Sequence, residues 1–277
     1  MHHSSYKIII ILDMQQIIDI GANLTDKQFR NDLYEILEKA YQQNITIIIT
    51  GSTIKSSYDA FEIVRKNQKY NLFSTVGIHP HNAKMWNEKT KSSIIDLSKN
   101  KEIVAIGECG LDYNRMFSTK EQQLYCFEQH IQIAIDAELP LFCHERDAFD
   151  DFIKIIDKYK NKLIEKNIKI VIHCFTGNLY EASEYIKRGC YIGLTGFICD
   201  DRRNINITNI IRKHIIPLDK LMTETDAPYM TPSFSIPRRN EPSNIKYVIG
   251  KLAELFSLSE NEIISQTTRN AISVFNL

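Results

Sequence analysis

Six acidic or histidine side chains stand at or just after the ends of short apolar runs, and they are the residues that could carry chemistry. Histidine nitrogens and carboxylate oxygens together form a donor set for divalent cations. One such histidine alone is more often a hydrogen-bonded structural residue, but carboxylates crowded together need a cation to offset their repulsion. The combination therefore predicts a site for one or two divalent cations. The six residues are Asp19, His79, Glu108, His144, His173 and Asp226.

Eight apolar runs rich in Ile and Val predict the strands that must bring these residues together. Runs that are apolar throughout are typical of parallel strands covered on both faces. The predicted strands are Ile17–Ile20, Ile45–Thr50, Leu72–Gly77, Val104–Gly107, Leu141–Cys143, Ile170–Ile172, Cys190–Gly193 and Lys220–Thr223.

Helical patterns fill the intervals between these runs. The segment 27–41 places its apolar residues on one stripe, and the spellings Ser118–Glu121 and Ser259–Glu262 are typical of helix-opening capping boxes. Eight strand-and-helix units in about 250 residues match a barrel whose strand ends meet at one mouth, where catalytic residues gather. We therefore predict an α/β fold, a single (β/α)8 TIM barrel over residues 1–277, although a doubly wound sheet would alternate in the same way.

The composition excludes several functional classes. The chain has 34 Lys and Arg against 34 Asp and Glu, so it lacks the basic excess of proteins that coat nucleic acid. A nuclease that grips only a few phosphates remains compatible with this balance. We treat residues 1–12 as an extension, of which Met1–Ser5 has the composition of a tag remnant. The apolar run at 8–12 is too short for a signal or membrane segment, which predicts a cytoplasmic or nuclear protein.

Three of the six cysteines flank predicted metal ligands: Cys109, Cys143 and Cys174. No CxxC pair is present, which argues against a zinc knuckle or a thioredoxin-type site. Because neighbours along a strand point to opposite sides, we expect these thiols to face the helices as small apolar fillers. The alternative is that they are soft zinc ligands.

Seven short segments at the predicted strand ends carry a family resemblance. They are Asp19–Asp26 (DIGANLTD), Gly77–His81 (GIHPH), Gly107–Arg115 (GECGLDYNR), Phe142–Asp147 (FCHERD), His173–Gly177 (HCFTG), Glu224–Tyr229 (ETDAPY) and Arg239–Pro242 (RNEP). In this order they resemble the TatD family of metal-dependent deoxyribonucleases, from Asp19 nearly to the C-terminus. Each segment alone is weak, but seven in order are specific.

The resemblance implies metal-binding roles for four residues. Glu108 corresponds to the glutamate that bridges two metal ions, and His144 and His173 correspond to metal-binding histidines. Asp226 corresponds to the aspartate that binds metal beside the attacking water. We therefore expect Asp226 and Glu108 to be catalytic, with two divalent cations, either Zn²⁺ or Mg²⁺/Mn²⁺.

The resemblance also implies substrate contacts. His79 corresponds to a pocket histidine that contacts phosphate, and Arg115 and Arg239 lie within family motifs and are expected to pair with phosphate. For an arginine, a surface salt bridge is the ordinary alternative. The arginines of the predicted mouth loops are Arg115, Arg146, Arg238 and Arg239. Aromatic residues there that could stack on unpaired bases, or simply pack, are Tyr113, Phe175 and Tyr229.

The first strand departs from the family pattern. Many relatives carry an Asp-x-His-x-His sequence there, whereas this chain reads Asp-Ile-Gly-Ala-Asn over residues 19–23. Both histidines are missing, so one metal site has fewer protein ligands. Mg²⁺ completed by water and phosphate oxygens would suit such a site.

The predicted function is hydrolysis of DNA phosphodiesters by water activated with two metals, as a 3′–5′ exonuclease acting on single-stranded or frayed ends. We expect DNA as the partner, with no membrane and no obligate protein partner. Two alternatives remain open. One is a small-molecule amidohydrolase or lactonase on the same barrel, and the other is a metal-poor scaffold protein.

Overall fold

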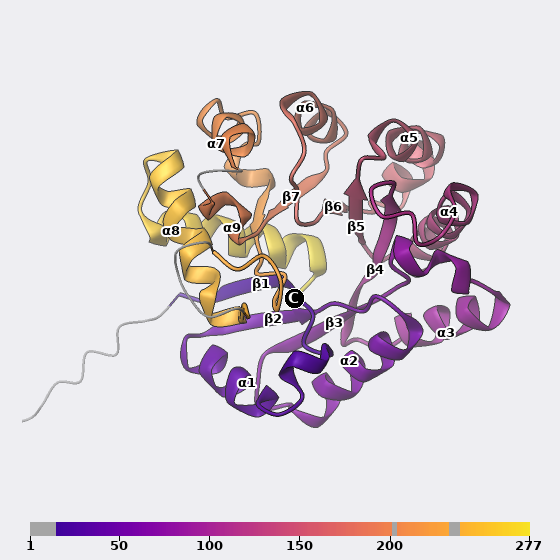
Figure 1. Cartoon of the computed structure of the whole chain (residues 1–277), viewed down its shortest axis with the longest axis horizontal. Coiled ribbons are helices and arrows are strands. Elements are labelled where there is room, and N and C mark those ends of the chain that lie inside the picture. The colour runs from indigo at the N-terminus through magenta and orange to yellow at the C-terminus, as the bar shows by residue number, and fades with distance from the viewer. Residues whose placement is uncertain (1–14, 201–203, 233–238) are drawn as a thin grey trace, which may run out of the picture.

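In the computed structural model, residues 15–200, 204–232 and 239–277 are described, and they form a ring of eight parallel strands surrounded by helices (Figure 1). The strand order follows the chain from β1 to β8. The ring closes where Ala22 and Ala227 form a parallel bridge. This confirms the predicted (β/α)8 barrel. Residues 1–12 and Arg238 lie outside the described residues. The strands are β1 Ile17–Ala22, β2 Ile45–Ile49, β3 Leu72–Val76, β4 Ile103–Asp112, β5 Leu141–Arg146, β6 Ile170–Ile172, β7 Tyr191–Leu194 and β8 Leu221–Thr223.

The helices begin largely where the sequence signals them. The terminal helix opens at the predicted Ser259–Glu262 capping box, whereas the long fourth helix is capped one residue later than predicted, by Thr119 with Gln122. The helix predicted over 27–41 is divided, because Asp26 caps a separate 3-10 turn at Lys27–Phe29. The α-helices are α1 Leu33–Gln42, α2 Ile54–Lys66, α3 Glu88–Ser98, α4 Lys120–Ala137, α5 Phe149–Glu165, α6 Leu179–Lys187, α7 Ile205–Arg212, α8 Ile245–Phe256 and α9 Glu260–Phe275.

Strand β4 runs five residues beyond its predicted end at Gly107, to Asp112. Its added residues pair with β5, which itself runs three residues beyond its predicted end, and Cys109 lies opposite Cys143 and Asp112 opposite Arg146. The register shifts between Gly107 and Cys109, as at a β-bulge. Glu108 therefore lies inside a strand and not at its end.

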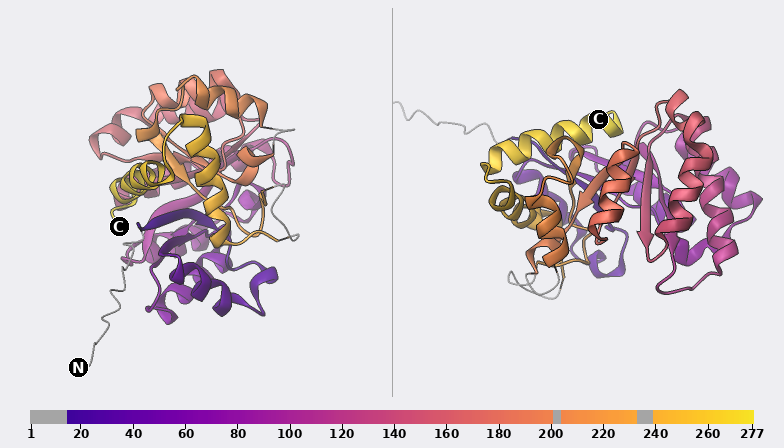
Figure 2. Two further views of the ribbon diagram at one scale, coloured as in Figure 1. Left: turned by 90° about the vertical axis from the view of Figure 1, so that its left-hand side faces the viewer. Right: turned by 90° about the horizontal axis from the view of Figure 1, so that it is seen from above.

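Apolar side chains fill the barrel below the mouth. Ile18, Ile48 and Phe142 pack inside the ring against Val274 and Phe275 of α9, which lies along β1 (Figure 2). A second, larger apolar layer separates the strands from the surrounding helices. Among the described residues, none of the helices combines the length and apolar character that crossing a bilayer requires.

Candidate metal centre

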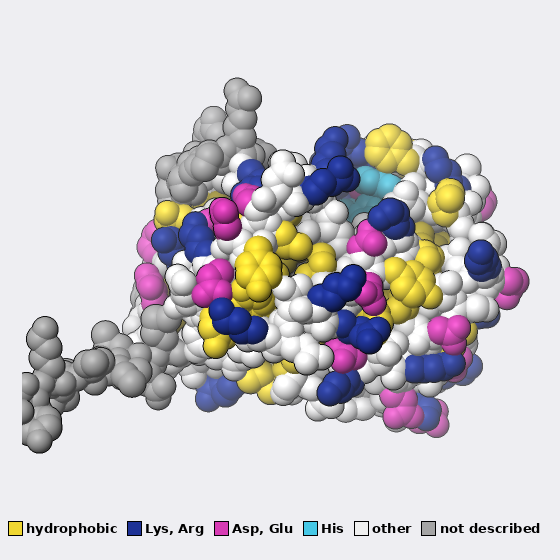
Figure 3. Space-filling view, turned by 90° about the horizontal axis from the view of Figure 1, so that it is seen from below, with side chains coloured by type: hydrophobic (Ala, Val, Ile, Leu, Met, Phe, Trp, Pro, Cys, Tyr) yellow, Lys and Arg dark blue, Asp and Glu magenta, His cyan; other side chains and the backbone are white. Residues whose placement is uncertain are grey.

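One cavity, of about 480 Å³, opens at the carboxyl ends of the strands and contains all four predicted metal ligands. Figure 3 shows histidine side chains at the bottom of a hollow, with cationic and hydrophobic side chains around its rim. The predicted substrate residues His79 and Arg115 line the same cavity. The remaining lining residues are Asn23, Ser52, His81, Asn82, Asp112, Phe117, Arg146, Cys174, Tyr229 and Met230.

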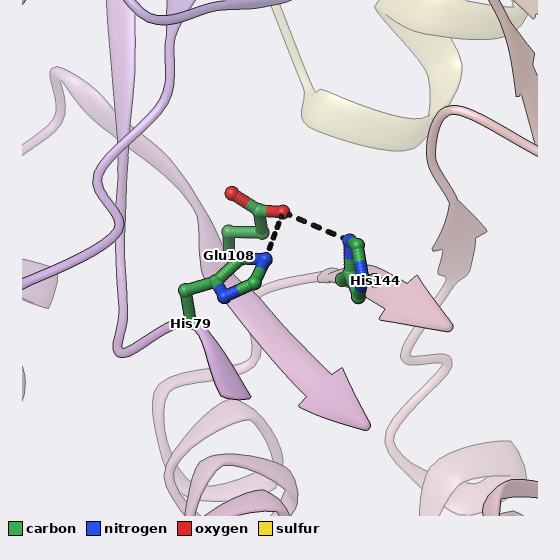
Figure 4. A group of neighbouring side chains, drawn as sticks. All are labelled: His79, Glu108 and His144. Carbon is green, nitrogen blue, oxygen red and sulfur yellow. Dashed lines mark ion pairs between the residues drawn. The ribbon is translucent and has the colours of Figure 1, made fainter. Parts of the chain in front are cut away.

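Glu108 is the centre of this cavity. Its Oε1 lies 2.8 Å from Nε2 of His173, 3.3 Å from Nε2 of His79 and 3.3 Å from Nδ1 of His144. Figure 4 shows the rings of His79, from the loop after β3, and of His144, from β5, converging on this carboxylate. Burial alone would raise the pKa of Glu108, but His79 and His173 outweigh it and hold the pKa well below its usual range. Glu108 is therefore an anion ringed by nitrogens.

A second carboxylate, Asp112, supports the same histidines. Its Oδ2 lies 2.9 Å from Nε2 of His81 and 3.1 Å from Nε2 of His144, and its Oδ1 accepts the backbone N–H groups of Asn114 and Arg115. Burial opposes ionisation, but these hydrogen bonds, that of His144 first, lower the pKa of Asp112. Sequence reasoning missed this role. The signal was the even spacing of Asp112 from Glu108, which places both on one face of a strand.

His144 is held between the two carboxylates. Burial alone would lower its pKa, but the hydrogen bonds to Asp112 and Glu108 raise it. The raised pKa of His144 and the lowered pKa of Glu108 have the same origin, since each stabilises the charged form of the other.

Asp226 reaches the cavity from the turn after β8. Its φ of 53° lies in the left-handed region, which aspartate adopts more readily than most residues. Asn23 donates a hydrogen bond of 2.8 Å to its Oδ1. Burial, together with the charges on Glu108 and Glu224, raises the pKa of Asp226 to about 7, although His173 opposes this. Oδ1 is thus occupied, while Oδ2 is left for a ligand.

The hydrogen bonds of His79 determine which ring nitrogen carries its proton. Nδ1 accepts the backbone N–H of His81 at 3.0 Å, so the proton of the neutral ring is on Nε2, facing Glu108. Burial lowers the pKa of His79 to about 3, against the pull of Glu108. Behind this loop, Nε2 of the buried His130 accepts the backbone N–H of Ile78 at 3.0 Å. Sequence reasoning did not find His130, which lies inside the long helix α4 with no motif around it.

Two expectations about neighbouring residues are wrong. Asp19 is not at the mouth: it is fully buried within β1, where it accepts hydrogen bonds from the backbone N–H and hydroxyl of Thr225. Cys174 faces the cavity instead of the helices. Strand alternation does not extend to it, because β6 ends at Ile172 and Cys174 has a φ of 47°. Cys109 and Cys143 do pack in the layer against the helices, as predicted.

The arginines fall into two groups. Arg115 and Arg146 line the cavity, and neither guanidinium has a partner within the described ranges. Arg239 is not brought to the cavity, because it forms a two-pronged ion pair with Asp32 and stacks over Phe29 at 4.8 Å. A phosphate contact by Arg239 would require this pair to open.

The aromatic residues also divide. Phe175 is buried, and the Tyr113 ring lies outside the cavity with the Lys120 ammonium 5.0 Å from its centroid, so neither ring faces a ligand in the cavity. Tyr229 lines the cavity and is 50% exposed. Phe117, which sequence reasoning missed, is 55% exposed on the same rim and contacts the His81 ring edge-on at 4.9 Å. Its signal was an apolar Met-Phe pair in an otherwise polar loop.

The site fits a divalent cation. The ligand atoms of His79, Glu108 and His144 all lie within 4.8 Å of one another, and a third imidazole, His173, is in hydrogen-bond distance of the same carboxylate. A mixed nitrogen and oxygen donor set of this kind suits Zn²⁺, Mn²⁺ or Mg²⁺. A cation here would also relieve the crowding of Glu108 and Asp226 that raises the pKa of Asp226.

Comparisons with known proteins agree with this geometry. Residues 18–276 match the family model described as TatD related DNase. The 3′-5′ ssDNA/RNA exonuclease TatD of Escherichia coli (strain K12) is 36% identical over 266 residues, covering 94% of this chain and 99% of that protein. The protein of the same name from Erwinia tasmaniensis is 38% identical, covering 94% of this chain and 100% of that protein.

A solved structure shows the same likeness in three dimensions. The crystal structure of a hydrolase TatD family protein from Entamoeba histolytica superimposes with a TM-score of 0.84 at 29% identity, covering 94% of this chain and 98% of that one. The family match spans almost all of the described barrel and every residue of the metal centre. The chain therefore belongs to the TatD-related DNase family and is a hydrolase of that family, as the sequence predicted.

Proposed function

We propose that this chain is a metal-dependent 3′–5′ exonuclease that hydrolyses single-stranded DNA with the help of two divalent cations. The observation that carries the proposal is that Glu108, His144, His173 and Asp226 line one cavity together with Arg115, whose guanidinium has no partner among the described residues. The names of the Escherichia coli and Erwinia relatives support the direction of attack and the single-stranded substrate.

The hydrogen bonds support one assignment of roles among the histidines. Asp112 holds Nε2 of His144 and so leaves its Nδ1 facing Glu108. His173 presents Nε2 to the same carboxylate. His79, whose proton is on Nε2, is a hydrogen-bond donor in this arrangement and not a ligand. We therefore propose Glu108, His144, His173 and Asp226 as the ligands, and His79 as a donor to a phosphate oxygen.

Residues of the chain itself accept the proton from water and bind the substrate phosphates. Bound divalent cations lower the pKa of water and neutralise charge on the phosphate. The carboxylate of Asp226 would orient the attacking water and accept its proton. Asn23 fixes the orientation of this carboxylate through Oδ1. Arg115 and Arg146 pair with the phosphates that flank the scissile bond.

Exposed rings on the rim support a single-stranded substrate. Phe117 and Tyr229 both line the cavity with about half of their surface exposed. Stacking on an unpaired base is worth roughly 1–3 kcal/mol per base, and the bases of a duplex are not free to stack in this way. The two rings are therefore proposed to hold unpaired bases on either side of the attacked phosphate.

The test is cleavage of single-stranded DNA labelled at either the 5′ or the 3′ end, with Mg²⁺, Mn²⁺ or Zn²⁺ titrated into chelator-treated protein. We expect metal-dependent release of mononucleotides from the 3′ end by the wild type, and none by Glu108→Ala. Glu138→Ala, which removes an exposed glutamate paired with Lys166, is the matched control and should cleave normally.

Equal cleavage by the wild type and Glu108→Ala would refute the proposal. Hydrolysis of a lactone panel without any cleavage of DNA would favour the amidohydrolase alternative. Failure to bind any of the three cations would favour the scaffold alternative.

A further inference from the structure

A buried carboxylate lies behind His173 and has none of the roles proposed above. Glu224 follows β8 directly and is fully buried. Its Oε1 accepts a hydrogen bond from the backbone N–H of Cys174, and its Oε2 lies 3.5 Å from Nδ1 of His173. Within the described residues, Oε2 and Nδ1 are buried atoms that have no hydrogen-bond partner. Oε2 of Glu224 and Nδ1 of His173 are therefore the polar atoms best placed to satisfy one another.

Two glycines make the space in which this carboxylate lies. A Cβ added to Gly21 would come within 2.7 Å of Oε2 of Glu224, and one added to Gly193 within 2.6 Å of Oε1. Neither glycine has a positive φ, so the backbone does not explain the choice of residue. Glycine is required at both positions because any larger residue would push Glu224 away from His173.

The ring of His173 is held on its face as well as at its edge. Phe142 stacks on it with centroids 4.7 Å apart and planes inclined by 29°. A Cβ on Gly21 would also press on this phenyl ring, at 3.0 Å from its Cζ. With the ring plane set by Phe142, the edge contact with Glu224 directs Nε2 at Oε1 of Glu108, 2.8 Å away.

We propose that Glu224 is a positioning residue that keeps the proton of His173 on Nδ1, so that the lone pair of Nε2 faces the cation beside Glu108. The inference rests on the proposed function, in which His173 binds metal. Histidines that bind metals commonly donate their other N–H to a carboxylate, which fixes the ring and its tautomer. Gly21 lies on β1, and its missing side chain leaves the space that Glu224 occupies.

The substitution Glu224→Gln isolates this role. Glutamine fits the same space, and its amide oxygen still accepts the N–H of Cys174, so the loop keeps its anchor. Its NH₂ group then faces Nδ1 of His173 and can only donate, which moves the histidine proton to Nε2. We expect Zn²⁺ affinity, measured by calorimetry on chelator-treated protein, to fall by about 10–100-fold. Nitrogen NMR of histidine-labelled protein should report the Nε2–H form of His173.

Glu145→Gln is the matched control. Like Glu224, Glu145 is an acid beside a proposed ligand, although it is only partly buried, and it accepts the N–H of Ala148 and the hydroxyl of Tyr185 on the helix side of β5. Its substitution should leave Zn²⁺ affinity unchanged.

A second pair of variants covers the case in which Glu224→Gln does not fold. Gly21→Ala should weaken Zn²⁺ binding in the same direction, because its Cβ displaces Glu224. Gly250→Ala in α8 meets only Oε1 of Glu260 at 3.4 Å and should bind Zn²⁺ normally.

Wild-type affinity in both Glu224→Gln and Gly21→Ala would overturn the inference. Weakened binding with the Nδ1–H form of His173 retained would overturn it too, since Glu224 would then be only a structural anchor. A wild type that binds Zn²⁺ with the Nδ1–H form but cleaves no nucleic acid would refute the proposed function and leave this inference standing. A wild type that binds no divalent cation would overturn both.

Discussion

The substitution His130→Gln removes a buried imidazole that holds the loop carrying His79 through a hydrogen bond from the N–H of Ile78. His130 is fully buried in α4, where Nε2 accepts the backbone N–H of Ile78 and Nδ1 donates to the carbonyl of Cys126 at 2.7 Å. Burial lowers the pKa of His130 from 6.5 to about 4. The folded chain therefore keeps this ring neutral at pH values where the unfolded chain protonates it.

The pH dependence follows from these two pKa values. As the pH falls through about 6.5, the unfolded chain takes up a proton at this position, and the folded chain does so only near pH 4. The free energy of unfolding that the neutral ring contributes is thus lost as the pH falls from about 6.5 to about 4. The two pKa values differ by about 2.5 pH units. At about 1.4 kcal/mol per unit, this costs the wild type roughly 3 kcal/mol. Glutamine does not titrate and carries no such cost.

Urea unfolding followed by circular dichroism at pH 7.5 and at pH 4 measures the effect. At pH 7.5 we expect His130→Gln to be less stable than the wild type by about 1–3 kcal/mol, because the N–H of Ile78 loses a well-placed acceptor. At pH 4 the difference should shrink or reverse. His214→Gln, at an exposed position, is the control and should follow the wild type. Parallel curves for His130→Gln and the wild type would refute the reasoning.

Four further substitutions test a buried carboxyl group, an ion pair and the proposed contacts with the substrate. Burial raises the pKa of Asp19 to about 8, so the folded chain holds a proton that the unfolded chain releases near pH 3.8. The free energy of unfolding should therefore fall as the pH rises between these two values. Asp19→Asn should flatten this pH dependence in urea unfolding measured at pH 5 and pH 8.5. Arg115→Ala should raise the KM for single-stranded DNA about tenfold without changing unfolding, whereas Arg239→Ala should lower the free energy of unfolding by about 1 kcal/mol. Phe117→Ala should weaken binding of single-stranded DNA by about 1–3 kcal/mol in fluorescence anisotropy, and unchanged binding would exclude base stacking there.

The barrel could be predicted from the sequence because most strands coincide with a short run of apolar residues. The run Ile170–Ile172 is apolar throughout and Ile45–Ile49 has only one threonine, and the ends of both strands fall within a residue of the predicted positions. The extension of β4 to Asp112 could not be predicted this way, because residues 108–112 read as a polar turn. They form a strand only because they pair with the extended end of β5, and such pairing between distant segments cannot be read from the local sequence.

The sequence could single out Glu108, His144, His173 and Asp226 because acidic and histidine side chains interrupt or follow apolar runs there, whereas it gave no such signal for the residues that support them. Glu224 and Asp112 belong to quoted motifs, yet nothing in the sequence shows that they lie behind His173 and His144. His130 lies in an ordinary amphipathic helix. Contacts between residues far apart in the chain determine these roles, and so does the left-handed turn that brings Cys174 into the cavity.

The central claim is that Glu108, His144, His173 and Asp226 hold a divalent cation in one cavity. The most direct test is a crystal structure of the protein soaked in Mn²⁺, with anomalous scattering recorded at the manganese edge. We expect an anomalous peak within coordination distance of Glu108, His144 and His173, and a second peak nearer Asp226. A cavity without any peak at saturating Mn²⁺, or peaks only at surface carboxylates, would contradict the account.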